Sequence, residues 1–287
     1  MIKSALINTH HYTSSAKINL GLQVLNKRED GYHNLQSYFV EIDLQDELGF
    51  SSSATFQLSV EGVKVPDDDS NLISKAYKII RAKTETVDTE YTIHLKKRIP
   101  IGGGLGGGSS NAAATLKALN QLWKLNLSPQ ELEKMGAKLG ADIPFFIKGG
   151  VQLIEGIGDM LTPIDLAPLE GISFLLVAPP IHISTPWAYG ALNKSLQPDK
   201  SHPKFPPLSK PMKWELFDND FERVIRKTYP EIGKIKENLQ NAGALYAGLS
   251  GSGSTVFGVF DNQQKAEALL GNFFPYQTFL SSPVFRL

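Results

Sequence analysis

The most informative feature of this sequence is a glycine-rich segment, Pro100-Ile-Gly-Gly-Gly-Leu-Gly-Gly-Gly-Ser-Ser-Asn111, in which six of seven consecutive residues are glycine. Because glycine loses the most backbone entropy on folding, such a cluster indicates positive φ angles combined with close approach of the backbone to a ligand. Residues 112–123 have helical apolar spacing, and three polar residues could cap that helix: Ser109, Ser110 and Asn111. N–H groups at the start of a helix, at the positive end of its dipole, most often bind phosphate.

The segment fits neither of two familiar phosphate loops. A Walker A loop would end in Gly-Lys-Ser or Gly-Lys-Thr, and this segment contains no lysine. A Gly-x-Gly-x-x-Gly pattern is present at Gly102, Gly104 and Gly107, but a dinucleotide fold places it after a buried parallel strand. Here residues 91–99 alternate apolar and polar side chains, like a half-exposed antiparallel strand. We therefore predict a phosphate-binding loop of a third kind, because a flexible linker would not lie directly between a strand and a helix.

Composition excludes several classes of function. The 287 residues suffice for two domains or one large one, and 41% hydrophobic with 20% charged residues is typical of a globular protein. Basic and acidic residues number 29 each, so no net charge attracts the chain to nucleic acid or to an anionic membrane. The chain has no cysteine, no His-x-x-x-His pair, no run of 18 apolar residues and no apolar signal-peptide core near its start. We expect a soluble, cytoplasmic protein.

Residues 15–25 alternate like a strand and carry two polar residues on one face, Lys17 and Asn19. On spacing alone a solvated strand face is favoured for these two residues over the wall of a polar site. Asp30-Gly31 is a turn signal, and Tyr32 and His33 follow it. That pair could stack on a flat ring and bind its edge, although a packed tyrosine beside a surface histidine is equally well supported.

Further regular elements follow from the same patterns. Strands are predicted over 37–43, 56–65, 91–99, 151–161 and 172–178, and a helix begins at Leu72 after three solvated aspartates. Ser128-Pro-Gln-Glu131 is a capping box that begins a helix ending at Leu139, before Gly140.

Asp142 lies just after that helix, and Pro144 favours an extended Ile143. A strand is then expected to begin over residues 145–147. On this loop Asp142 is either a structural cap or a placed catalytic group.

The C-terminal half contains a second glycine-rich turn, Gly248-Leu-Ser-Gly-Ser-Gly-Ser-Thr-Val-Phe-Gly258, between strands predicted over 244–249 and 255–260. Its N–H groups could line an anion nest, and a tight hairpin is the alternative. Helices are expected after residues 183–189 and over 231–241 and 263–270, and a last strand over 284–287. The proline-rich residues 197–214 are expected to form an ordered excursion or a mobile loop.

Three segments together resemble the signature motifs of the GHMP kinase superfamily: Ala16-Lys-Ile-Asn-Leu20, the glycine-rich segment, and Leu249-Ser-Gly-Ser-Gly-Ser254. Two more, Lys27-Arg-Glu-Asp-Gly-Tyr-His33 and Gly140-Ala-Asp-Ile-Pro-Phe-Phe146, resemble the family of 4-diphosphocytidyl-2-C-methyl-D-erythritol kinases of the non-mevalonate isoprenoid pathway. The resemblance implies an α+β fold of two domains, over 1–160 and 161–287. The first would be like domain 2 of ribosomal protein S5, and the second would be ferredoxin-like.

The resemblance also implies the chemistry, which is ATP-dependent phosphorylation of the 2-hydroxyl of the methylerythritol moiety, with Mg²⁺. It implies a catalytic pair, Lys17 and Asp142. The positions that match the ATP site are Pro100, Ile101, Gly102, Gly103, Gly104, Leu105, Gly106, Gly107, Gly108, Ser109 and Ser110, with Asn71 and Lys97 near the adenine. The positions that match the substrate side are Asn19, Tyr32, His33, Thr185 and Tyr189, and Ser110 is a candidate metal ligand. Tyr189 stands where the family pattern has phenylalanine, which keeps a flat ring.

Other interpretations remain open at this point. Homoserine or phosphomevalonate kinases are the nearest, but their small substrates carry no base for Tyr32 and His33 to stack on. A nucleotide-binding module without transfer activity would need neither Lys17 nor Asp142, and a dinucleotide oxidoreductase lacks its acidic ribose ligand. For partners, we expect a small-molecule substrate, no nucleic acid, no membrane, and a monomer or weak homodimer.

Overall fold

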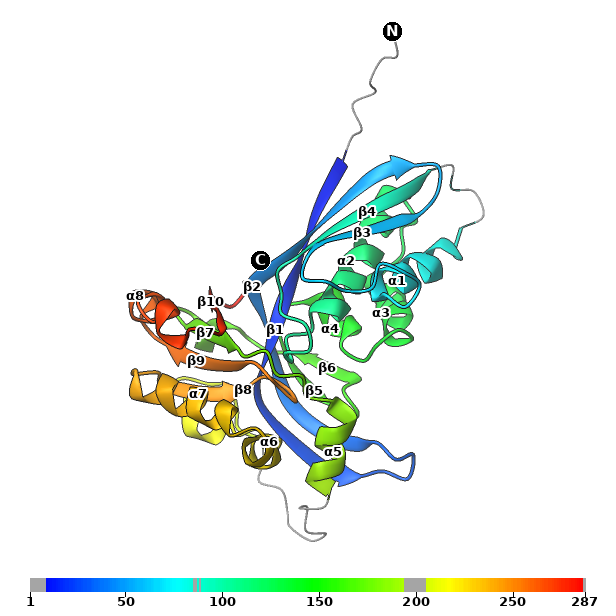
Figure 1. Ribbon diagram of the computed structural model, residues 1–287. Helices are drawn as coiled ribbons and strands as arrows, with labels where there is room; N and C mark the ends of the chain where they lie inside the picture. Colours follow the sequence, from blue (N-terminus) through cyan, green and yellow to red (C-terminus); the bar gives the residue numbers. More distant parts are fainter. Residues whose placement is uncertain (1–8, 85–86, 88, 194–204, 286–287) are drawn as a thin grey trace. The chain divides into compact units, whose positions relative to one another are not determined.

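The computed structural model describes residues 9–84, 87, 89–193 and 205–285, and its elements are labelled in Figure 1. The chain forms two compact units. The first unit consists of the residues up to Ser15, Gln45–Ile101 and Gly107–Lys148, and the second of Ala16–Leu44, Gly102–Gly106 and Gly149–Leu287. Two long strands, β1 (Thr9–Lys27) and β2 (His33–Ser53), each contribute residues to both units. The glycine-rich segment is likewise divided between them.

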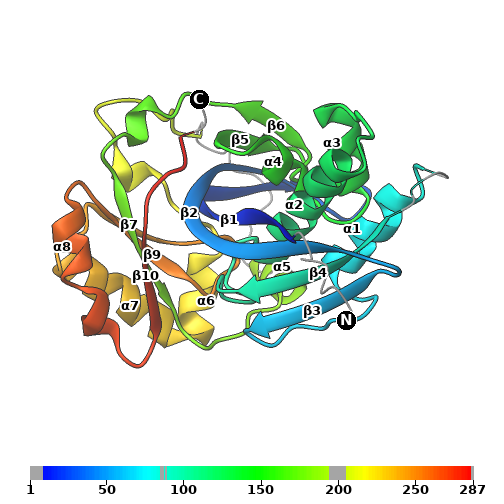
Figure 2. The ribbon, with the colours of Figure 1, turned by 90° about the horizontal axis from the view of Figure 1, so that it is seen from above.

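The first unit combines a small sheet with four helices. Residues 47–53 of β2 pair antiparallel with β4 (Glu90–Lys97), and β4 pairs parallel with β3 (Gln57–Gly62). The helices are α1 (Leu72–Arg81), α2 (Gly107–Leu122), α3 (Pro129–Ala137) and α4 (Ile143–Lys148). They pack against one another, and Figure 2 shows them together on one side of β3 and β4.

Local sequence signals explain how these helices begin. The Asn71 side chain caps α1 by accepting from the backbone N–H of Ile73 at 2.9 Å. The predicted capping box of α3 is confirmed, because Ser128 and Glu131 satisfy each other's backbone N–H groups and Pro129 occupies the first turn. The helix ends at Ala137, earlier than the predicted Leu139.

The strand predicted over residues 145–147 is wrong, because these residues lie in helix α4. Ile143 is the first residue of that helix and not an extended residue. Pro144 is then in the first turn, where the missing N–H would have had no partner within the helix. The apolar run is buried, with Phe145 and Phe146 edge to face at 4.9 Å between ring centroids. A short apolar run does not distinguish a buried helix from a strand by periodicity.

The second unit contains a hairpin and a four-stranded antiparallel sheet. Residues 37–40 of β2 pair with β5 (Val151–Glu155), which pairs with β6 (Met160–Pro163), so the strand predicted over 151–161 is two strands. The sheet has the order β10 (Gln277–Ser281), β7 (Ser173–Ala178), β9 (Val256–Phe260) and β8 (Tyr246–Leu249). Strand β10 was not predicted. Of the strand predicted over 284–287, Val284 and Phe285 are not in a strand, and the last two residues lie outside the described part.

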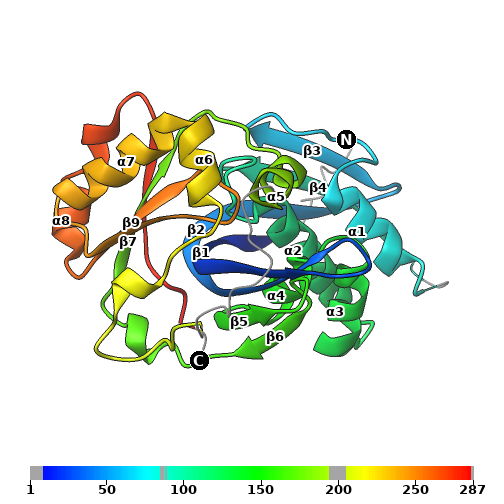
Figure 3. The same cartoon turned by 90° about the horizontal axis from the view of Figure 1, so that it is seen from below.

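Four helices cover one face of this sheet. They are α5 (Thr185–Asn193), α6 (Glu222–Thr228), α7 (Pro230–Asn241) and α8 (Gln263–Glu267). Figure 3 shows α6 and α7 beside β9. Their apolar side chains form one buried cluster with the sheet, including Leu22 and Val24 from β1. The described residues of the unit also form three short 3₁₀ turns, Ala167–Leu169, Trp214–Leu216 and Leu270–Phe273.

The described part of the proline-rich segment packs against the long strands. Residues 197–204 lie outside the described residues, and the remainder forms no helix or strand from Phe205 to Lys213. The Phe205 ring lies 5.1 Å from that of Tyr38, whose hydroxyl donates to the Pro206 carbonyl at 3.2 Å. None of the helices in the described ranges combines the length and the apolar composition needed to cross a bilayer.

Candidate active site

The glycine-rich segment forms a loop through Gly106 and then enters α2 at Gly107. The helix thus begins before the predicted Ala112. Ser109, Ser110 and Asn111 lie inside it, so the prediction that one of them caps it is wrong. The first N–H groups of an α-helix have no partner within the helix, so the glycines themselves supply the donors at its start. The predicted anion site still has free N–H groups at the start of a helix. These groups belong to the glycines rather than to residues near Ala112.

In the second unit, the glycine loop is held by residues Leu249–Thr255, which join β8 to β9 and are called the 249–255 loop below. The Ser250 hydroxyl donates to the Gly104 carbonyl at 2.9 Å, and the Thr255 N–H donates to the Gly103 carbonyl at 3.1 Å. Gly104 has φ +78°, and a Cβ there would lie 2.0 Å from the Ser250 carbonyl oxygen. Only glycine fits this contact. The two glycine-rich motifs, far apart in sequence, are therefore neighbours. The 249–255 loop connects two antiparallel strands, as the hairpin alternative expected, and the anion nest stays a prediction.

In the first unit, several predicted residues surround the first turn of α2. A Cβ on Gly107 would lie 2.8 Å from the Nζ atom of Lys97, so Lys97 is packed directly against this turn. A Cβ on Gly108 would lie 3.6 Å from Leu72, the residue after Asn71, and a Cβ on Gly140 would lie 3.9 Å from the Ser109 hydroxyl. Lys97, the residue that follows Asn71 and the turn that leads to Asp142 thus all lie at the start of α2.

Lys97 takes part in a buried polar cluster that sequence reasoning missed. Its ammonium pairs with the carboxylate of Asp46, and the two residues are 6% and 0% exposed. Asp46 also accepts from the N–H groups of Arg98 at 2.7 Å and Ile99 at 2.8 Å, and from the Asn111 amide at 2.8 Å. Burial lowers the pKa of Lys97 below its ordinary value, and Asp46 offsets part of that effect. The cluster fixes β4 to α2.

Lys17 and Asn19 are buried on β1, 4% and 2% exposed, so the solvated face favoured on spacing alone is wrong. The Lys17 ammonium donates to the Asn19 side-chain oxygen at 2.5 Å and lies 4.3 Å from the centroid of the Phe39 ring. The Asn19 amide donates in turn to the Ser37 hydroxyl at 2.9 Å. The backbone N–H of Lys17 donates to the Leu105 carbonyl at 3.0 Å, which ties this strand to the glycine loop.

The aromatic residues predicted for base recognition divide into two kinds. His33 is buried and stacks on Tyr189, with ring centroids 5.4 Å apart and an interplanar angle of 22°. Tyr189 packs edge to face on Phe221 at 4.9 Å. Tyr32, by contrast, is 63% exposed. The second unit therefore contains a stacked pair of rings, His33 and Tyr189. Tyr32, which precedes His33 in the sequence, has a solvent-exposed ring.

Thr185 begins α5, and its hydroxyl hydrogen-bonds that of Ser252 at 2.9 Å. The 249–255 loop thus reaches Thr185 as well as Gly104. Asp142 is half-buried on the turn before α4. It belongs to the first unit and Lys17 to the second, so their pairing stays a prediction.

Among the described residues, no group of three or more His, Cys, Asp or Glu side chains could hold a metal ion. The described residues could therefore bind Mg²⁺ only as nucleotide enzymes do, with phosphate oxygens and one or two protein oxygens as ligands. Ser110 is buried at the start of α2 and remains a candidate ligand.

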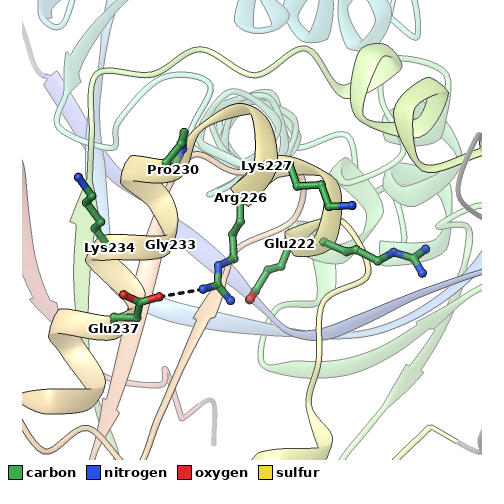
Figure 4. A pocket seen from close by; sticks show the side chains of 8 residues that line it. Glu222, Arg226, Lys227, Pro230, Gly233, Lys234 and Glu237 are labelled. Carbon is green, nitrogen blue, oxygen red and sulfur yellow. Dashed lines mark hydrogen bonds and ion pairs between the residues drawn. The ribbon is translucent and has the colours of Figure 1, made fainter.

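A cavity of about 530 Å³ lies between α6 and α7 and is lined by none of the predicted site residues. Figure 4 shows the Arg226 guanidinium at its centre, paired with Glu237 at 3.0 Å, while the charged ends of Lys227 and Lys234 point to opposite sides. Arg226 also lies across Gly233, where a Cβ would be 2.9 Å from its Nε atom. The Arg226 guanidinium at the centre of the cavity already has Glu237 as its partner, so we assign this cavity no role in catalysis.

Comparison with known proteins places these features in a family context. Residues 71–150 match the family model described as GHMP kinases N terminal domain, and residues 202–274 match that described as GHMP kinases C terminal. A 4-diphosphocytidyl-2-C-methyl-D-erythritol kinase of Thermodesulfovibrio yellowstonii is 41% identical over 274 residues, covering 91% of this chain and 93% of that relative. A kinase of the same name from Bacteroides fragilis is 41% identical over 258 residues, covering 88% and 92%.

Solved structures agree with the sequence matches. A crystal structure of a 4-(cytidine 5'-diphospho)-2C-methyl-D-erythritol kinase has a TM-score of 0.82 and 28% identity, covering 96% of this chain and all (100%) of that one. A homoserine kinase from Cytophaga hutchinsonii has a TM-score of 0.66 at 20% identity, covering 99% and 97%, which shows a shared fold alone. The predicted α+β fold class is confirmed.

Proposed function

The chain belongs to the 4-diphosphocytidyl-2-C-methyl-D-erythritol kinases of the GHMP kinase family, and from this we propose that it transfers the γ-phosphoryl group of ATP to the 2-hydroxyl of 4-diphosphocytidyl-2-C-methyl-D-erythritol. The products are the 2-phosphate and ADP, within the non-mevalonate route to isoprenoid precursors. The 41% identity over 91% of the chain carries this proposal. The contact of the glycine loop with the 249–255 loop supports it.

The ATP phosphates bind at the loop from Gly102 to Ser110, where backbone N–H groups and the start of α2 favour negative charge. Ser110 would hold Mg²⁺ together with the ATP phosphates, and the ion would supply positive charge that offsets the negative charge of the phosphates. Asn71 and Lys97 lie on the adenine side. The packing of Lys97 against Gly107 and of Leu72 near Gly108 supports that placement.

Phosphoryl transfer requires positioning and charge stabilisation more than covalent chemistry by the protein. Lys17 stabilises charge on the transferring group, and its contacts with Asn19 and Phe39 hold the ammonium in one place. Asp142 accepts the proton of the substrate hydroxyl or orients that hydroxyl. Because a neighbouring ammonium weakens a carboxylate as a base, the orienting role is favoured if Lys17 lies beside it.

The cytidine base is recognised on the second unit by Tyr32, His33 and Tyr189. The stacked His33 and Tyr189 rings form a preformed aromatic wall, and the open Tyr32 ring can pack on the base. Asn19 and Thr185 contact the rest of the substrate. Homoserine and phosphomevalonate carry no base, so this wall favours the cytidine-bearing alcohol.

The enzyme works in the cytoplasm as a monomer or weak homodimer and without nucleic acid. Equal numbers of basic and acidic residues, 29 each, support the last point.

A coupled assay of ADP release with Mg²⁺ and ATP tests the proposal. It compares 4-diphosphocytidyl-2-C-methyl-D-erythritol with the same alcohol lacking cytidine, with homoserine and with phosphomevalonate. We expect turnover only with the cytidine-bearing alcohol. Turnover with another alcohol would reassign the substrate pocket, and ATP binding without turnover on any of them would support a nucleotide-binding module instead.

A further inference from the structure

A short segment that leads into α6, Asn219–Glu222 or the 219–222 segment, holds the 249–255 loop through a buried asparagine. Asn219 is 5% exposed, and its Nδ2 atom donates to the carbonyl oxygens of Leu249 and Gly251, each at 2.8 Å. Its Oδ1 atom accepts from the Phe221 N–H at 2.9 Å. Because carbonyls only accept and an N–H only donates, these partners fix the orientation of the amide. Asn219 therefore holds the backbone on both sides of Ser250.

The rest of the segment anchors this asparagine. The Asp220 carboxylate accepts from the Val24 N–H of β1 at 2.7 Å, and Glu222 accepts from the Leu249 N–H at 3.0 Å. The second Glu222 oxygen accepts from Lys236 of α7 at 2.5 Å. The 219–222 segment thus joins β1, α7 and the 249–255 loop into one hydrogen-bonded arrangement.

Ser250, fixed in this way, contacts two parts of the second unit that are predicted to act in catalysis. One is the glycine loop, and the other is the strand that carries Lys17 and Asn19. Its hydroxyl accepts from the Asn19 N–H at 3.2 Å and donates to the Gly104 carbonyl at 2.9 Å. A Cβ on the next residue, Gly251, would lie 3.2 Å from the Asn19 Oδ1 atom, which accepts from Lys17. A shift of the loop would therefore move the phosphate loop and Lys17 together.

We propose that Asn219 is a positioning residue for phosphoryl transfer. By fixing the carbonyls of Leu249 and Gly251, it sets the place of Ser250, and through Ser250 the places of Gly104 and of the Asn19–Lys17 pair. The inference rests on the proposed kinase function. Asn219 acts through these groups and is assigned no contact of its own with ATP or substrate.

The Asn219→Asp variant tests the proposal with almost no change in shape. A carboxylate cannot donate to the two carbonyls, so kcat/KM for ATP should fall by about tenfold or more at neutral pH. A buried carboxylate that faces carbonyl oxygens has a raised pKa and, once protonated, regains one donor. The ratio of the variant's kcat/KM to that of the wild type should therefore rise as the pH is lowered. Circular dichroism at each pH gives the folded fraction of the variant, so recovery by refolding can be told apart from recovery of activity in the folded enzyme.

Asn262→Asp is the matched control. Asn262 caps α8 in the same unit by accepting from the Lys265 N–H at 3.1 Å, and aspartate caps a helix equally well. The ratio of the kcat/KM of Asn262→Asp to that of the wild type should stay near one at every pH. An Asn219→Asp ratio that is equally flat and near one would overturn the proposal.

A double-mutant cycle with Ser250→Ala tests the route of the effect. If Asn219 acts through Ser250, the loss caused by Asn219→Asp should be smaller in the Ser250→Ala background. Additive losses would contradict that route. If Asn219→Asp does not fold, as judged by circular dichroism, Asn219→Ser keeps one hydroxyl donor and takes its place in the cycle.

Failure of the proposed function would be recognised separately. If the wild-type chain phosphorylates none of the alcohols, the affinity of each variant for a non-hydrolysable ATP analogue is measured by calorimetry. The positioning inference then predicts weaker binding by Asn219→Asp and unchanged binding by Asn262→Asp. Equal affinity of the wild type and Asn219→Asp would overturn it.

Discussion

Each compact unit contains a buried lysine, and the two lysines are held in different ways. In the first unit, Lys97 pairs with Asp46, a carboxylate that accepts three further hydrogen bonds from backbone and side chain. In the second unit, a neutral amide oxygen and the face of the Phe39 ring orient the ammonium of Lys17. The comparison indicates that Lys97 serves mainly to build its unit. Lys17, by contrast, donates its backbone N–H to Leu105 of the glycine loop proposed to bind ATP, and its partner Asn19 donates to Ser250 of the 249–255 loop.

From this comparison we expect substitution of Lys97 to have the largest effect on stability. Lys97→Met leaves the Asp46 carboxylate buried without its cation, which should lower the free energy of unfolding by about 3–5 kcal/mol. Denaturant unfolding measures this loss. Adding Asp46→Asn should restore part of it, because no unpaired charge then remains. A stability equal to that of the wild type would show that the ion pair is not structural.

At Lys17 the loss should appear in catalysis instead. Removing one group that stabilises transition-state charge costs about 10²–10³ in kcat, so Lys17→Met should lose that much turnover. Its midpoint of thermal unfolding should change less than that of Lys97→Met. If Lys17→Met unfolds as readily as Lys97→Met and its folded fraction keeps full turnover, the distinction between the two lysines is wrong.

Asp142→Asn tests the proposed partner of Lys17 in the other unit. Turnover should fall by at least about 10², the lower figure for loss of a general base, while nucleotide binding stays near that of the wild type. Steady-state kinetics and calorimetry measure the two properties. Unchanged turnover would remove Asp142 from the mechanism.

The smallest predicted effect concerns the base. Stacking on an aromatic ring contributes about 1–3 kcal/mol per base, so Tyr32→Ala should raise KM for the cytidine-bearing alcohol far more than KM for ATP. Tyr32→Phe keeps the ring and should keep KM for the alcohol. Equal increases in the two KM values for Tyr32→Ala would exclude Tyr32 from cytidine recognition.

Local sequence patterns predicted the parts of the site that depend on neighbouring residues. The capping box of α3 and the two strands that flank the 249–255 loop follow from cap and turn signals within a few positions. The burial of Lys17 did not follow, because alternation along a strand does not reveal whether a second layer covers its polar face. The helix at Phe145 was missed because a short apolar run suits either a helix or a strand.

The features of the site that could not be predicted from the sequence depend on contacts between residues far apart in the chain. Asp46 lies in a polar stretch that resembles a solvated surface, and its partners Lys97 and Asn111 are 51 and 65 residues away. The contact of Ser250 with Gly104 spans 146 residues. Only the fold brings these groups together, so the cluster of Asp46 and the contacts of Asn219 with the 249–255 loop could be found only in the structure.

The most direct test of the proposed reaction is a ³¹P NMR spectrum of the purified chain with Mg²⁺, ATP and 4-diphosphocytidyl-2-C-methyl-D-erythritol. Our account predicts that a new phosphomonoester resonance grows as ATP is converted to ADP and the diphosphate signals of the alcohol persist. This resonance should show no three-bond splitting by protons, because C2 of the methylerythritol moiety carries no hydrogen. Conversion of ATP to ADP with only inorganic phosphate as the other product, or a phosphate at another position, would contradict it.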